Sequence, residues 1–94
     1  MLRMDESEFI ARAMRDYLRS LVEPKDMRSM DWDLDAGEPV SAVCTGLAIA
    51  DQYSVSLPPL LVEKIESIEN LRDIDSEFIQ ERLANLPKWW ELAS

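Results

Sequence analysis

Histidine is absent from the 94-residue chain, cysteine occurs once and glycine occurs twice. Without histidine, the chain lacks the side chain that most often acts as a general base and that commonly binds zinc. A single cysteine cannot form an intrachain disulfide, and two separated glycines cannot form the glycine-rich loop that cradles phosphate groups. We therefore expect a protein that is not an enzyme and that holds no metal or cofactor.

Positive charge is also scarce, because ten lysines and arginines face nineteen acidic residues, giving a formal net charge of −9. Nucleic acids and anionic membranes bind clustered basic side chains, so this excess of acid argues against both as partners. The longest uncharged run, residues 39–50, has twelve residues, fewer than the roughly 20 that span a bilayer. The acidic N-terminal residues lack the apolar core of a signal peptide. These features predict a cytoplasmic protein whose partners are basic.

Apolar residues make up 47% of the chain, which suffices for one modest core in a single domain spanning residues 1–94. They recur at helical spacing in four segments, which we expect to form helices over about 5–22, 39–53, 59–72 and 75–86. The mostly short connections predict an all-α fold, a small four-helix antiparallel bundle, with one further turn after Pro87. We expect a monomer or a weak dimer.

Two of the expected helices begin with residues typical of a helix start. Asp5 and Glu8 have the spacing of a capping box. Ile74, Asp75 and Ile79 have the pattern of a hydrophobic staple around a cap. These residues predict where the first and the last helix of the bundle begin.

The segment that follows Pro39 is apolar on nearly every side, which is typical of a helix in the middle of a domain. Proline suits the first turn of a helix because the N–H that it lacks would have no helical partner there. The β-branched residues of this segment leave a buried strand open as an alternative. Cys44 lies within it, and we expect a buried small apolar side chain rather than a nucleophile, because no histidine can activate it.

Residues 24–38 are polar, and we expect them to form a long loop between the first two helices. Asp31, Asp33 and Asp35 have the spacing of the first three ligands of an EF-hand. The glycine that this motif requires next is replaced by Ala36, and its final glutamate is also missing. We therefore expect no calcium site in this loop.

The net charge is distributed unevenly along the chain. Residues 1–30 contain six acids and six bases, whereas residues 31–94 contain thirteen acids and four bases and therefore carry the whole balance of −9. A surface of one sign steers a partner of the other sign, although it also serves solubility alone. A tryptophan among acids can anchor such an interface. We predict a binding surface formed by the tryptophan and the acids around it, together with three glutamates of the third helix: Asp31, Trp32, Asp33, Asp35, Glu38, Glu63, Glu66 and Glu69.

The run from Leu34 to Ala42 contains Asp35-Ala36-Gly37-Glu38-Pro39. It resembles the helix-entry motif of MafI-type immunity proteins, which accompany polymorphic and contact-dependent toxins. The resemblance covers about residues 31–71. It implies a mostly helical cytoplasmic inhibitor that binds and neutralises a cognate toxin domain, commonly a nuclease. Two alternatives stay open: an acidic helical adaptor or regulatory module that binds another basic protein, and a mimic of nucleic acid.

Overall fold

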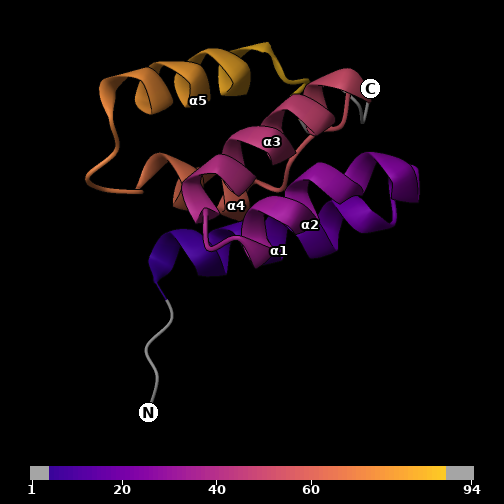
Figure 1. Ribbon diagram of the computed structural model, residues 1–94. Coiled ribbons are helices and arrows are strands. Elements are labelled where there is room, and N and C mark those ends of the chain that lie inside the picture. The colour runs from indigo at the N-terminus through magenta and orange to yellow at the C-terminus, as the bar shows by residue number, and fades with distance from the viewer. Residues whose placement is uncertain (1–4, 89–94) are drawn as a thin grey trace.

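The computed structural model describes residues 5–88, and these residues form helices and connecting segments without a strand. The expectation of an all-helical chain is confirmed. Five α-helices occur in this part of the chain, and a short 3-10 helix, η1, precedes the second of them (Figure 1). Their bounds are α1 Glu6–Arg19, η1 Pro24–Met27, α2 Arg28–Asp35, α3 Pro39–Gln52, α4 Pro59–Glu66 and α5 Asp73–Asn85.

The expected number of four helices is wrong because residues 24–38 are mostly helical rather than a loop. Pro24 opens the 3-10 turn of η1, and α2 continues directly from it. Met27, Met30 and Leu34 recur at helical spacing and are all buried. Three apolar side chains on one side are enough to hold this otherwise polar segment against the core. The loop interpretation relied on the polar composition and overlooked this apolar stripe.

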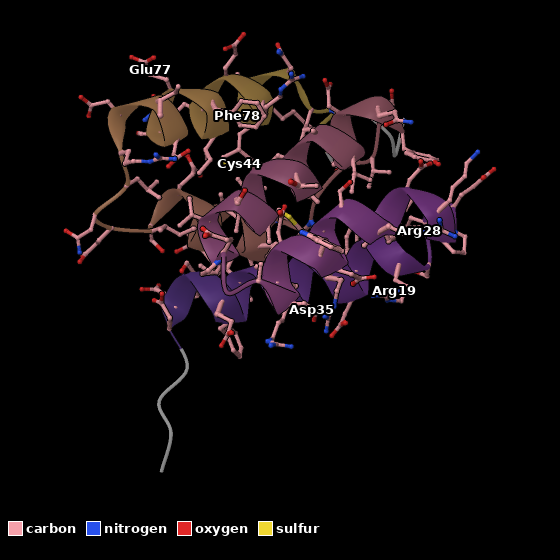
Figure 2. The ribbon with its side chains drawn as sticks, in the orientation of Figure 1. Arg19, Arg28, Asp35, Cys44, Glu77 and Phe78 are labelled. Atoms are coloured by element: carbon pink, nitrogen blue, oxygen red, sulfur yellow. The ribbon has the colours of Figure 1, made fainter. Side chains whose placement is uncertain are left out.

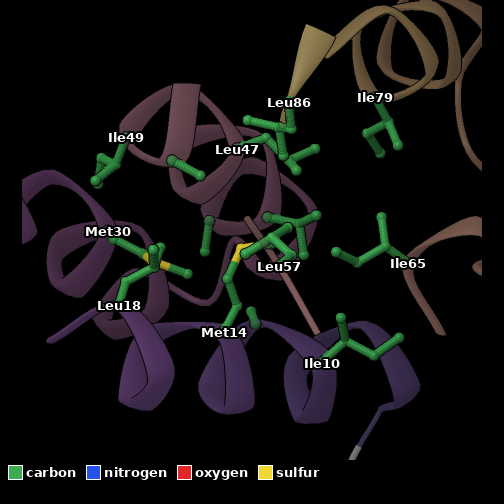
Figure 3. Close-up of a cluster of buried hydrophobic side chains, with 14 of the residues drawn as sticks. Ile10, Met14, Leu18, Met30, Leu47, Ile49, Leu57, Ile65, Ile79 and Leu86 are labelled. Carbon is green, nitrogen blue, oxygen red and sulfur yellow. The ribbon is translucent and has the colours of Figure 1, made fainter. Parts of the chain in front are cut away.

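Helix α3 lies at the centre of the fold and packs against α1, α2 and α5. In Figure 1 it lies between α5 on one side and the α1–α2 pair on the other. It begins at Pro39 as expected, and the alternative of a buried strand is wrong. Because three helices surround it, α3 needs apolar side chains on several faces, and Val43, Leu47 and Ile49 are buried on it. Figure 3 shows Leu47 and Ile49 among core side chains from the neighbouring helices.

Helices α1 and α2 both approach α3 closely at Gly46. A Cβ atom added to this residue would overlap Sδ of Met14 on α1 and would lie 3.0 Å from Cε of Met30 on α2. Both methionines are fully buried. The missing side chain therefore leaves the space in which α1 and α2 both pack onto α3, and the flexible methionines fill it.

The ends of several helices differ from those expected from the sequence. Asp5 is the N-cap residue of α1, but its side chain makes no capping hydrogen bond and instead accepts one from Ser7 Oγ at 3.0 Å. Helix α4 ends at Glu66, well before residue 72, and Asn70 adopts a left-handed φ of 62° in the link that follows. The further turn expected after Pro87 involves residues 89–94, outside the described range.

The start of α5 also differs, because its N-cap residue is Arg72 and Asp75 lies in the first turn. The staple between Ile74 and Ile79 is wrong as well. The side chain of Ile74 is 69% exposed, whereas Ile79 is buried in the core. Asp75 instead pairs with Arg72 at 3.0 Å.

Polar contacts join elements that are distant in the sequence. The Tyr17 hydroxyl on α1 donates to the carbonyl oxygen of Ser56 at 2.8 Å, before α4 begins. Arg82 on α5 pairs with Asp51 on α3 at 2.6 Å, and its guanidinium group lies 5.1 Å from the centre of the Phe78 ring. The hydrogen bond of Tyr17 fixes the segment between α3 and α4 onto α1. The ion pair between Arg82 and Asp51 helps to hold α5 against α3.

The contact at Gly46 makes a prediction about stability. Alanine is favoured over glycine inside a helix by about 1 kcal/mol, but an extra methyl group in a filled core costs about 1–3 kcal/mol. We expect Gly46→Ala to lower the free energy of unfolding by about 1 kcal/mol, measured by urea denaturation.

The control is the same substitution in a Met14→Ala background, where the Sδ atom is gone. There Gly46→Ala should lower the free energy of unfolding by less than it does in the wild type, because the overlap with Sδ is gone and only the 3.0 Å approach to Cε of Met30 opposes the gain in helix propensity. A similar loss in both backgrounds would contradict the contact between Gly46 and Met14.

Candidate functional site

Helix α2 presents a tryptophan to solvent. The side chain of Trp32 is 77% exposed, the largest exposed fraction among the exposed large apolar residues of the described part of the chain. Met30 and Leu34 lie on the opposite side of the same helix and are buried against the core. Helical geometry therefore turns Trp32 outward, because the residue midway between two buried positions lies on the far face.

The two aspartates next to Trp32 are held by neighbouring helices. Asp31 accepts a hydrogen bond from Arg19 on α1 at 2.7 Å, and Arg15 lies 3.9 Å from the same oxygen. Asp33 accepts a hydrogen bond from Thr45 Oγ1 on α3 at 2.8 Å. These two carboxylates thus attach α2 to the helices on either side, and they are less available to a partner than the sequence suggested.

Asp35 and Glu38 differ from the first two acids of this segment. Both are exposed, and neither carboxylate makes a hydrogen bond or an ion pair within residues 5–88. Asp35 is the last residue of α2 and Glu38 is the N-cap residue of α3, and the turn between them contains Gly37 with a φ of 75°. A carboxylate at the start of α3 also interacts favourably with the helix dipole.

The three glutamates of the predicted surface lie on a different part of the fold. Glu63 and Glu66 are exposed on α4, and Glu69 is exposed in the link after it. Helix α4 packs against α1 and α5, whereas α2 packs against α1 and α3. The structure therefore brings Asp31, Trp32, Asp33, Asp35 and Glu38 together in one segment and places the three glutamates on other elements.

Sequence reasoning missed the arginines that belong to this surface. Arg28 begins α2, is exposed, and forms no ion pair within the described range. Arg15 and Arg19 approach α2 from α1 through their contacts with Asp31. Arg28 could have been found from the sequence, because it lies four residues before Trp32 and therefore on the same face of a helix. That inference requires residues 28–35 to be recognised as a helix.

A cavity of about 360 Å³ lies at the start of α3 and is lined by residues of α3, of the α4–α5 link and of the first turn of α5, among them Cys44, Arg72 and Asp75. Cys44 is only partly buried, so it is less enclosed than expected. Burial, followed by the nearby charge of Asp75, raises the pKa of its thiol to about 11. A thiol with this pKa is protonated at neutral pH and is a poor nucleophile.

A groove of about 380 Å³ lies between α4 and α5 and is lined mainly by apolar side chains, including Leu57, Val62 and Leu83. Residues 5–88 contain no cluster of three or more histidine, cysteine or acidic side chains suited to a metal ion. In the same part of the chain, no helix has the length and apolar character needed to cross a membrane. The exposed side chains of α2 and these two hollows are among the features that can take part in recognition.

The exposed position of Trp32 predicts that it contributes little to folding. We expect Trp32→Ala and Asp35→Ala each to change the free energy of unfolding by less than about 0.5 kcal/mol, as is usual for surface positions. Asp31→Ala should lower it by about 0.5–1 kcal/mol because two arginines lose their partner. Urea denaturation of the three variants measures these effects, and an equal loss for Trp32→Ala and Asp31→Ala would contradict the arrangement of α2.

The raised pKa of Cys44 predicts slow alkylation. At pH 8 the thiolate fraction of Cys44 is about 100-fold below that of a thiol with a pKa near 9. A more basic thiolate is about tenfold more reactive, so the expected decrease in the alkylation rate is about tenfold. We expect iodoacetamide to react with the folded chain at least about tenfold more slowly than with the urea-unfolded chain. The rate should rise as the pH approaches 11, and equal rates in the folded and unfolded chains would contradict the shift.

The site therefore consists of an exposed tryptophan on a short helix, two tethered aspartates, and unpaired charges at the ends of that helix. Comparison of the chain with family models, curated proteins and solved structures finds no match. The functional argument consequently rests on the residues and their arrangement.

Proposed function

We propose that this protein is an immunity protein that binds and neutralises a cognate bacterial toxin domain in the cytoplasm. The observation that carries the proposal is the exposure of Trp32 on α2, beside the unpaired carboxylates of Asp35 and Glu38. Tryptophan is among the residues that most often dominate the binding energy of protein interfaces. The resemblance of residues 34–42 to the helix-entry motif of MafI-type immunity proteins supplies the identity of the partner.

The charge of the chain supports a basic partner. Residues 31–94 carry a balance of −9, and a nuclease toxin needs a basic surface to hold the phosphates of its substrate. Opposite fields on two proteins raise the rate of association by orders of magnitude at low salt. Fast capture suits an inhibitor that must act before its toxin damages the cell.

An acidic adaptor for another basic protein would use the same surface, and the identity of the partner separates the two functions. A mimic of nucleic acid is less well supported, because a mimic presents a continuous row of negative charge. On α2 the carboxylate of Asp31 is paired with Arg19 and lies near Arg15. The acids of α2 are therefore interrupted by positive charge.

Co-expression tests the proposed function. We expect the protein to restore the growth of cells that express the toxin domain encoded next to its gene, and to co-purify with that domain. A chain carrying Trp32→Ala together with Asp35→Lys should restore growth less well at equal expression. The matched control carries Ile74→Ala and Glu81→Lys, two exposed positions on α5, and should protect as well as the wild type. Failure of the wild-type chain to restore growth or to bind the toxin would overturn the immunity function.

A further inference from the structure

The outer face of α2 carries two unpaired charges of opposite sign with the tryptophan between them. Arg28, Trp32 and Asp35 follow one another at helical spacing, and all three are exposed. Figure 2 shows Arg28 and Asp35 at opposite ends of α2. Neither charge forms an ion pair or a hydrogen bond within residues 5–88.

The other basic side chains near the start of α2 are paired, unlike Arg28. Arg19 pairs with Asp31 at 2.7 Å, and Lys25 in η1 pairs with Glu23 at 3.6 Å. At the other end, Glu38 follows Asp35 across a short turn. The unpaired charge on this face is therefore positive at Arg28, where α2 begins, and negative at Asp35, where it ends.

The negative end is unfavourable for the isolated chain. Asp33 and Asp35 lie in the last turn of α2, which contains no basic residue. The C-terminal end of a helix carries a partial negative charge, so it repels carboxylates and favours lysine or arginine. Thr45 compensates Asp33 through its hydrogen bond, but the structure offers Asp35 no such compensation within the described residues. A local rule broken on an exposed face is expected where a partner supplies the missing interaction.

We propose that α2 docks on a protein surface that has an apolar pocket flanked by two charges of opposite sign. The pocket receives the indole of Trp32, a basic side chain of the partner faces Asp35, and an acidic side chain faces Arg28. The proposal rests on the proposed function, because the partner is the toxin domain. It adds the segment that binds, the residue that enters the pocket and the direction in which α2 lies on the partner.

This arrangement differs from binding through a uniformly acidic field. In a uniform field, every added negative charge on the inhibitor strengthens association with a basic partner. With charges of opposite sign at the two ends, reversal of either charge places like charges opposite each other. The two descriptions therefore predict opposite effects for Arg28→Glu.

The test measures the binding kinetics of the toxin domain with four single variants. We expect Trp32→Ala to raise Kd by about 30-fold or more, the effect of a dominant interface residue. Asp35→Lys and Arg28→Glu should each raise Kd by about fivefold or more, largely through slower association at low salt. The control Glu81→Lys, a charge reversal of an exposed acid on α5, should leave Kd within about twofold.

The outcomes separate this proposal from the proposed function. If the wild-type chain binds the toxin and Arg28→Glu tightens the complex, the proposal that opposite charges at the two ends of α2 face opposite charges on the partner is overturned. The immunity function still stands in that case. If Trp32→Ala and Asp35→Lys both bind the toxin as tightly as the wild type does, α2 is not part of the interface. This result also overturns the docking proposal and leaves the immunity function standing. Absence of binding by the wild-type chain overturns the proposed function and, with it, the partner named here.

A second measurement uses the free chain and needs no partner. Asp35→Lys replaces a repelled carboxylate with a favoured cation, so we expect the midpoint of urea unfolding to rise by about 0.2 M. Glu81→Lys serves again as the control. A variant that binds less tightly while being more stable would show that Asp35 is maintained for recognition, and an unchanged or lower midpoint would overturn the charge argument for this residue.

Discussion

The close packing of α1 and α2 onto α3 at Gly46 is the contact on which the arrangement of the other elements depends. Met14 and Met30 occupy the space that a side chain on Gly46 would fill, and both are fully buried. Because α3 also packs against α5, the central helix carries neighbours on several faces and needs an almost wholly apolar sequence. The absence of one side chain thus permits the close approach of three helices, which defines the core.

The position of the candidate binding face follows from that packing. Once Met30 and Leu34 are buried, helical geometry places Trp32 on the outside and Asp31 and Asp33 at the flanks. Arg19 and Thr45 then hold the two flanking carboxylates from α1 and α3. These contacts give α2 a fixed orientation, which fixes the backbone from which the exposed Trp32 projects. Preorganisation of this kind reduces the entropy lost on binding.

Much of the fold could be predicted from the sequence, because helical periodicity and proline positions are local signals. The helix that starts at Pro39 and the helical class of the chain are examples. Helix α2 was missed because its eight residues include four charged ones, and only three apolar positions in and before it reveal the buried side. The candidate site was predicted in part. Trp32 is exposed on α2 beside unpaired Asp35 and Glu38, whereas Arg28 was overlooked and Glu63, Glu66 and Glu69 lie on other elements.

The sequence by itself determined the helical class, the excess of negative charge and the lack of histidine. These properties depend on composition and on short-range spacing, which a linear chain displays directly. The tertiary structure decided which charges are free, because pairing depends on atoms from helices that are distant along the chain. Asp31 and Asp35 look alike in the sequence, but only Asp31 lies within reach of Arg19. The segment that the sequence presents as an acidic loop is therefore a helix with the unpaired charges of Arg28 and Asp35 at its two ends.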